Sequence, residues 1–164
     1  MVFKVVIALF ILQRLTELFI SKKNEKWLLV KGAVEYGQSH YPYMIALHAG
    51  FVLAVVCEYY LSPGKVISFS FLILFIVILI TKIMVINSLG KYWNTKIYRI
   101  PNFKPVKTGA YKFIRHPNYI LVVCEIITFP LIFHLYYTAI IFTLLNAIML
   151  SVRIKAENQV WSSN

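Results

Sequence analysis

The sequence contains no aspartate, and all six of its acidic residues are glutamate. This absence excludes the motifs that require aspartate, among them the EF-hand calcium loop, aspartate-based magnesium sites and the Ser-His-Asp triad. Only two cysteines are present, and Cys57 and Cys124 both lie in apolar runs, so we predict neither a disulfide framework nor a bound metal. The six glycines form no GxGxxG pattern, which excludes a soluble Rossmann-type nucleotide-binding domain.

Charge is also scarce: charged residues make up 14% of the 164 residues, whereas hydrophobic residues make up 60%. Soluble domains usually contain about 25% charged and about 45–50% apolar residues. A soluble domain of this length could not bury so much apolar surface, so we expect a lipid bilayer to solvate it. The expected fold class is therefore an all-α integral membrane protein, formed by residues 1–164 as a single domain.

Five apolar segments predict transmembrane helices, each near the roughly 20 residues that cross a bilayer. They are residues 2–20, 42–61, 66–89, 118–134 and 136–152. The first is the weakest, because Gln13, Arg14 and Glu17 interrupt it, but no cleavage pattern follows and we interpret it as a retained span. The last two meet at His134 and Leu135, a link so short that it predicts a tight helical hairpin.

The net charge of +11 is divided unevenly among the connecting segments. Four basic residues lie between the first and second spans, seven between the third and fourth, and two after the fifth. With five crossings, these 13 of the 17 basic residues share one face. The positive-inside rule predicts that this face is cytoplasmic, with the N-terminus outside and the C-terminus inside. Cations sorted by membrane side also argue against nucleic-acid binding.

Residues 90–117 form a long loop that is rich in aromatic residues, cations, proline and glycine, and loops of this length are usually functional or disordered. An interfacial belt that contacts lipid headgroups is the alternative interpretation. At its end, Pro117 suits the first turn of a helix, so His116 is held just before that turn. A helix start favours an anionic group, and Arg115 and His116 can bind a carboxylate or flank an adenine ring.

Two further features lie within the predicted spans. Glu125 lies several residues into the bilayer, where a carboxylate indicates either a functional site or a structural pair with Arg14 or Lys82. The spacing 4, 3, 4 places a second set of residues on one helical face, namely Asn146, Leu150, Arg153 and Glu157. Arg153 and Glu157 alone are typical of a weak surface salt bridge, but across a hairpin from His116 they predict a shared site.

These segments resemble a known family. The run TGAYKFIRHPNY, followed by Glu125 and then by TAIIFTLLNAIMLSVRIKAEN, is similar to the isoprenylcysteine carboxyl methyltransferase family and its phospholipid methyltransferase relatives. The upstream runs RLTELFISKKNEKWLL, GAVEYGQSHYP and GKYWNTKI resemble small bacterial members, so the resemblance covers nearly the whole chain. It implies a methyltransferase of the bacterial cell membrane that uses S-adenosylmethionine and has a cytoplasmic cofactor loop at residues 90–117.

The resemblance also implies roles for individual residues. The cofactor-binding set is Gly109, Tyr111, Arg115, His116, Pro117, Tyr119, Glu125 and Glu157. Arg153 and Glu157 are expected to be catalytic, and Arg153, Asn146 and His48 are expected to bind the acceptor, with a core role as the alternative for His48. The family's two consecutive glutamates are Glu157 and Asn158 here, and its Gly-Pro-Tyr is Gly-Ala-Tyr. The expected acceptor is a carboxylate or acidic hydroxyl of a lipophilic molecule, such as an isoprenylcysteine-like lipid or an alkylpyrone.

Two other classes of function stay open at this level. A membrane reductase that uses NADPH is one, because some sterol-type reductases have a similar C-terminal helical core. A non-enzymatic transporter or lipid-binding protein is the other, with the polar residues Arg14, Glu17, Glu58, Lys82 and Glu125 lining a path. Membrane lipids are expected neighbours in every case, and the oligomeric state is left open.

Overall fold

The structure, a computed structural model, describes residues 1–63, 66–103 and 106–162 and is mostly helical. Its five α-helices are α1 (Val2–Val30), α2 (Tyr41–Leu61), α3 (Phe69–Leu89), α4 (Pro117–Leu131) and α5 (Tyr136–Ser162). Three short 3-10 helices, η1 (Gln38–His40), η2 (Gly90–Tyr92) and η3 (Gly109–Lys112), and two strands, β1 (Val34–Tyr36) and β2 (Ile97–Arg99), complete the described elements.

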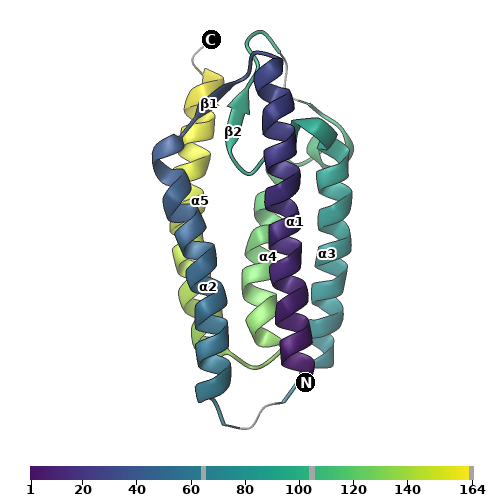
Figure 1. Cartoon of the computed structure of the whole chain (residues 1–164), viewed down its shortest axis with the longest axis vertical. Helices are drawn as coiled ribbons and strands as arrows, with labels where there is room; N and C mark the ends of the chain where they lie inside the picture. The colour runs from purple at the N-terminus through teal and green to yellow at the C-terminus, as the bar shows by residue number, and fades with distance from the viewer. Residues whose placement is uncertain (64–65, 104–105, 163–164) are drawn as a thin grey trace.

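The five α-helices form one elongated bundle (Figure 1). α2 packs on α5, α5 on α4 and α4 on α3, while α1 lies in front of α4 in the view of Figure 1. The two termini lie at opposite ends of the bundle. Both strands lie at the end that holds the C-terminus, so the connections from α1 to α2 and from α3 to α4 share that end.

Three helical segments in the described part of the chain are long and apolar enough to cross a membrane. They are Gln38–Leu61, Phe69–Tyr92 and Tyr136–Val160. α4 is apolar but shorter, and α1 carries the polar side chains that made the first predicted span the weakest. The chain is therefore a helical protein with three candidate membrane spans among five helices.

Several helices have other bounds than the spans that were predicted for them. α1 continues to Val30 and α5 to Ser162, about ten residues beyond their predicted spans, because both helices run on into the end of the bundle that holds the strands. α3 begins at Phe69 instead of residue 66. α4 ends at Leu131, where Pro130 is in its last turn, instead of at residue 134. The predicted hairpin is present. Its turn is closed by a hydrogen bond from the backbone N–H of Leu135 to the Pro130 carbonyl at 3.1 Å.

The all-α prediction was also incomplete, because β1 and β2 pair as an antiparallel ladder. A cluster of side chains supports it. Lys96 Nζ lies 2.9 Å from Glu25 and 3.3 Å from Glu35, and the Tyr98 hydroxyl donates to the same two carboxylates at 2.7 and 3.0 Å. Strands of three residues are too short to show a period of two, so the sequence pattern could not reveal them. The ladder joins the start of α2 to the loop after α3.

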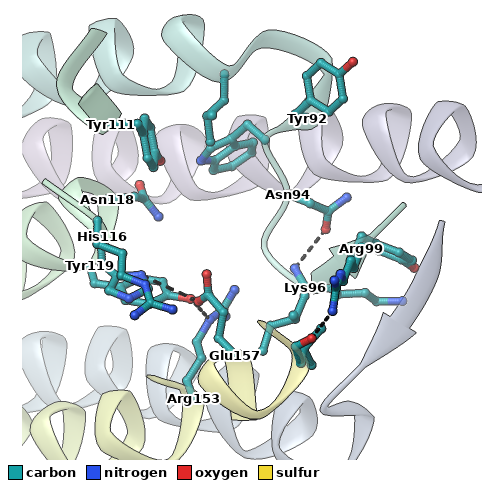
Figure 2. A pocket seen from close by; sticks show the side chains of 16 residues that line it. Tyr92, Asn94, Lys96, Arg99, Tyr111, His116, Asn118, Tyr119, Arg153 and Glu157 are labelled. Carbon is teal, nitrogen blue, oxygen red and sulfur yellow. Dashed lines mark hydrogen bonds and ion pairs between the residues drawn. The ribbon is translucent and has the colours of Figure 1, made fainter. Parts of the chain in front are cut away.

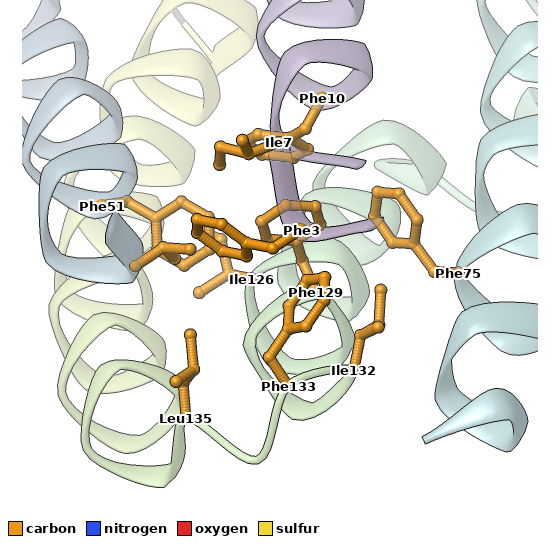
Figure 3. Packing of buried hydrophobic residues seen from close by; sticks show 11 residues of the cluster. Phe3, Ile7, Phe10, Phe51, Phe75, Ile126, Phe129, Ile132, Phe133 and Leu135 are labelled. Atoms are coloured by element: carbon orange, nitrogen blue, oxygen red, sulfur yellow. The ribbon is translucent and has the colours of Figure 1, made fainter. Parts of the chain in front are cut away.

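One phenylalanine from each α-helix contributes to an aromatic layer in the bundle, made of Phe10, Phe51, Phe75, Phe129 and Phe142. Phe129 lies between Phe51 and Phe75 (Figure 3), and it stacks on Phe10 with ring centroids 4.3 Å apart. Phe142 reaches the layer through Phe51, 5.5 Å away. Except for Phe142, these rings are almost fully buried, so apolar burial fixes the centre of the bundle.

Next to this layer lies an ion cluster made of Gln13, Arg14, Glu17, Lys82 and Glu125. The fully buried Glu125 accepts hydrogen bonds from Lys82 at 2.7 Å, Arg14 at 2.8 Å and Gln13 at 2.7 Å. Glu17 pairs with Lys82 at 2.7 Å and with Arg14 at 3.1 Å. The cluster holds two positive and two negative charges. An unpaired charge in a bilayer is costly, and this balance lets α1, α3 and α4 bury all four.

Candidate active site

The first turn of α4 is built around Pro117 and His116. Pro117 occupies the first helical position, where its missing N–H leaves no helical hydrogen bond unmade, and His116 is the N-cap residue. The backbone carbonyl of His116 accepts from the N–H of Tyr119 at 3.1 Å. The rings of His116 and Tyr119 are stacked, with centroids 5.0 Å apart and planes 6° from parallel. The turn thus presents two aromatic rings toward α5.

Across the hairpin, α5 supplies the two charged residues that the sequence placed on one face. Arg153 Nε donates to the Tyr119 hydroxyl at 2.7 Å, and that hydroxyl donates to Glu157 at 2.7 Å (Figure 2). His116 Nδ1 lies 3.7 Å from the same carboxylate. The structure thus brings His116, Tyr119, Arg153 and Glu157 together, joined by the hydrogen-bonded chain Arg153–Tyr119–Glu157.

The far side of the Arg153 guanidinium contacts α2. Its Nη1 lies 2.8 Å from the sulfur of Met44, and the residue is only 6% exposed. A thioether is a weak acceptor, so this donor is poorly satisfied. An anionic oxygen brought to the guanidinium would bind it more strongly than the sulfur does.

Two adjoining pockets open beside the hydrogen-bonded chain Arg153–Tyr119–Glu157, with volumes of about 140 Å³ and about 580 Å³. The larger falls within the roughly 300–1,000 Å³ of small-molecule sites. Of the residues predicted to bind cofactor or acceptor, Tyr111, Arg115 and Glu157 line both pockets, whereas His116, Tyr119 and Arg153 line only the smaller one. Asn158, which replaces the second family glutamate, is exposed and does not line either pocket.

Gly109 and Pro117 do not line these pockets and instead position residues that do. Gly109 has a φ of +53°, and a Cβ there would lie 2.7 Å from the Cβ of Ser88. The neighbouring Thr108 hydroxyl donates to the Ser88 carbonyl. Only glycine fits this close approach, which holds η3 against the end of α3 and turns Tyr111 toward the pocket.

Three other predicted residues lie deeper in the bundle. Glu125 belongs to the ion cluster and pairs with both Arg14 and Lys82, the structural alternative that the sequence left open. Asn146 is 3% exposed and His48 is half-buried. In the described part of the chain, Asn146 Nδ2 and His48 Nδ1 find no hydrogen-bond partner.

Several pocket residues were missed by the sequence reasoning, and they come from the first half of the long loop. They are Tyr92, Trp93, Asn94, Lys96 and Arg99. α1 holds this segment: Asn24 donates to the carbonyls of Gly90 and Trp93, and Asn94 donates to the carbonyl of Ser21 at 2.9 Å. A signal was available, because the runs SKKN and GKYWNTKI both belong to the resemblance and contact each other here.

The electrostatics of the pocket follow from burial and from its cations. Burial lowers the pKa of His116 and the guanidiniums of Arg115 and Arg153 lower it further, which outweighs the opposing effect of Glu157. The imidazole is therefore neutral at neutral pH. Burial, together with Glu157, raises the pKa of Tyr111 to about 12, so its hydroxyl remains a donor. Burial lowers the pKa of Lys96, but hydrogen bonds to Glu25 and Glu35 overcome this and the net pKa is raised.

Two buried polar atoms of the pocket lining indicate a ligand. Trp93 Nε1 is a donor and Asn118 Oδ1 an acceptor, and neither has a partner in the described structure. Buried polar groups are normally paired, so a ligand that both donates and accepts would satisfy the site. Among the described residues, no group of three or more histidines, cysteines and acidic residues could hold a metal ion.

Comparison with known proteins identifies the family. The model of the isoprenylcysteine carboxyl methyltransferase (ICMT) family matches residues 71–163. YpbQ of Bacillus subtilis, described only as uncharacterized, is 40% identical over 159 residues, which are 96% of this chain and 95% of its own. An uncharacterized protein of Haemophilus influenzae is 32% identical over 152 residues, 91% of this chain and 88% of its own. No solved structure matches.

The three candidate spans and the family match together indicate a helical membrane protein of a methyltransferase family. The chain belongs to the isoprenylcysteine carboxyl methyltransferase family, and the matched region includes α4, α5 and the loop before them.

Proposed function

We propose that this protein is an S-adenosylmethionine-dependent membrane methyltransferase that methylates an ionised oxygen of a lipophilic acceptor. The observation that carries the proposal is the hydrogen-bonded chain Arg153–Tyr119–Glu157 beside a pocket, inside the region that the family model matches. It places a cation able to hold an anionic acceptor next to a carboxylate able to face a cationic donor.

The pocket residues fit the cofactor group by group. Trp93 Nε1 and Asn118 Oδ1 offer the donor and acceptor that an adenine edge needs, and the stacked His116 and Tyr119 offer aromatic surface. Arg115 suits the cofactor's carboxylate, and Glu157 suits its ammonium or sulfonium charge. The chemistry that such a cofactor supplies is an electrophilic methyl group, which an anionic oxygen displaces in line.

The acceptor side follows from the protonation state that this reaction needs. A carboxylate or acidic hydroxyl is already ionised at neutral pH, so Arg153 has to bind and orient the oxygen and no strong general base is required. Two candidate acceptors are an isoprenylcysteine-like carboxylate and an alkylpyrone or related polyketide lipid.

We further propose five membrane crossings, with the N-terminus outside and the pocket on the cytoplasmic side of a bacterial membrane. The polar residues that weaken α1 as a span are paired in the ion cluster, while Leu12 and Leu15 on its other side are exposed for lipid contact. The basic connections lie at the same end of the bundle as the C-terminus, in accord with the positive-inside rule.

The test is cofactor binding by purified protein in detergent, measured by calorimetry. We expect saturable binding of S-adenosylmethionine that His116→Ala and Glu157→Ala weaken about tenfold or more, since each removes pocket contacts worth about 1–3 kcal/mol. Asn158→Ala, one residue along on the exposed side, is the matched control and should bind normally. Binding of NADPH without S-adenosylmethionine would favour a reductase and contradict the proposal.

A further inference from the structure

Below the pocket, toward the aromatic layer, polar side chains occupy one common depth. Counting toward the pocket end, Arg14 lies four residues from Phe10, His48 three from Phe51, Glu125 four from Phe129 and Asn146 four from Phe142. Residues three or four apart share a helical face. We call the set Gln13, Arg14, His48, Glu125 and Asn146 the polar layer.

Two contacts place His48 and Asn146 opposite each other on the antiparallel helices α2 and α5. Arg153 contacts Met44 on the pocket side, and Phe142 contacts Phe51 on the other side. His48 lies three residues on the pocket side of Phe51, and Asn146 lies four on the pocket side of Phe142. Measured from the Phe51–Phe142 contact, the two residues are therefore about 5 and about 6 Å along their helices, at nearly the same depth. His48 is four residues from Met44, which puts this depth about 6 Å below the Arg153–Met44 contact.

Within the described residues, the polar layer contains four buried side-chain atoms without a hydrogen-bond partner. They are Gln13 Oε1, Arg14 Nε, His48 Nδ1 and Asn146 Nδ2. The ion cluster is balanced in charge, yet two of its atoms, Gln13 Oε1 and Arg14 Nε, have no hydrogen-bond partner in the described structure. An unpaired polar group at this depth costs free energy that a ligand oxygen can recover. In the pocket, nearer the end of the bundle that holds the strands, Trp93 Nε1 and Asn118 Oδ1 likewise have no hydrogen-bond partner in the described structure.

His48 also connects the two levels. It lies within electrostatic range of Arg14 and Lys82 in the ion cluster and of Arg153 in the candidate active site. His48 Nδ1 and the Nδ2 of Asn146, which is 3% exposed, therefore lie unpaired between the candidate active site and the aromatic layer.

We propose that His48 and Asn146 form a second oxygen-binding subsite, which selects acceptors carrying another oxygen function about 6 Å from the oxygen held at Arg153. The inference rests on the proposed methyltransferase function and narrows its substrate class to lipids with a compact head that bears two oxygen groups. A simple fatty acid, with one carboxylate on an alkyl chain, leaves the subsite unpaired. Because the aromatic layer closes the bundle beneath, the lipid tail leaves sideways between helices.

The test uses two probes, a long-chain alkylphenol and the matching dihydroxy compound, which differ by one ring hydroxyl. Dissociation constants are measured in detergent with S-adenosylhomocysteine present, for the wild type, His48→Phe and Asn146→Leu. Thr143→Val is the matched control, because within the described residues its hydroxyl bonds to the Ala139 carbonyl of its own helix. Wild type and control should bind the dihydroxy probe about tenfold more tightly, the worth of one buried hydrogen bond, and the two variants should lose this preference.

Cofactor binding is measured in parallel and separates the two ways to fail. If all four proteins bind S-adenosylmethionine but the wild type binds both probes equally or neither, the second subsite is wrong and the methyltransferase proposal stands. The subsite is also wrong if the variants keep the preference. If the wild type does not bind the cofactor, the proposed function fails first.

Discussion

Arg153 and Tyr119, from the last two helices, are joined by a 2.7 Å hydrogen bond in which the guanidinium is the donor and the phenol is the acceptor. The same hydroxyl then has its own proton available for Glu157, 2.7 Å away. One oxygen therefore fixes the separation of a cation and an anion that would otherwise attract each other directly. In this arrangement Arg153 contacts Met44 of α2, and both Arg153 and Glu157 line the smaller pocket.

Removing that oxygen tests its role. We expect Tyr119→Phe to fold and to lower kcat/KM for methyl transfer about ten- to a hundredfold, as about 1–3 kcal/mol of positioning is lost when both partners lose their hydrogen bond. The readout is initial rates with radiolabelled cofactor. Tyr136→Phe is the control, because Tyr136 bonds only to His134 at the far end of the bundle. Unchanged turnover in Tyr119→Phe would show that Arg153 and Glu157 act independently.

The pKa of His116 predicts a pH dependence. Because burial, Arg115 and Arg153 hold it below the ordinary value of about 6.5, the ring is neutral at pH 7. Protonation on acidification adds a positive charge to the pocket that is proposed to hold a cationic cofactor. Affinity for S-adenosylmethionine should be constant at neutral pH and fall only as the pH drops through the lowered pKa of His116. Calorimetry from about pH 5 to about pH 8 measures this, and His116→Gln should flatten the acid limb.

The same shift has a consequence for stability, with the sign set by linkage. The unfolded chain binds the His116 proton more tightly than the folded protein does, so folding is favoured above the unfolded pKa and this contribution is lost as pH falls. His116→Gln should therefore reduce the loss of thermal stability at acid pH. If His116→Gln loses cofactor affinity and thermal stability at acid pH as much as the wild type does, another group titrates.

Lys82 holds the ion cluster together, since it contacts both Glu17 and Glu125. Lys82→Met leaves two buried carboxylates with one cation and should cost about 3–5 kcal/mol, read as a clear drop in Tm in detergent. Adding Glu125→Gln restores the charge balance, so the double variant should be more stable than Lys82→Met alone. Thr81→Val, next to it on the exposed side of α3, is the control. A double variant no more stable than the single one would contradict charge balance as the cause.

Alanine substitutions at Gly109 and Gly32 distinguish the effect of a steric clash from the effect of backbone strain. Both have a positive φ, but a Cβ at Gly109 meets Ser88 whereas a Cβ at Gly32 meets nothing within 4 Å. Gly32→Ala should cost only about 1–2 kcal/mol of strain and leave cofactor affinity unchanged. Gly109→Ala should in addition shift η3 and Tyr111 and weaken cofactor binding. Equal cofactor affinity in the two variants would show that η3 does not position Tyr111 for the cofactor.

The structural features that depend on residues close together in the sequence could be predicted from it. Apolar runs located the five helices, the His134–Leu135 link indicated the hairpin, and a helical face placed Arg153 and Glu157 opposite His116, where the structure has them. The contacts of Asn24 with the carbonyls of residues 90 and 93 carry no periodicity, so the pocket residues in the first half of the predicted cofactor loop were not named individually. The partner of Glu125 was left open, because a sequence does not show which cations from other helices share its depth.

The aromatic layer bears on how easily water and protons pass through the bundle. In the proposed topology, a bundle that is polar from its pocket down to mid-depth would offer water and protons a path across half of the membrane. The stacked rings of Phe10 and Phe129, closed in by Phe51 and Phe75, complete the barrier with apolar carbon. If the proposed topology and site hold, the protein would admit charged and polar ligands to its interior while the membrane around it keeps its voltage.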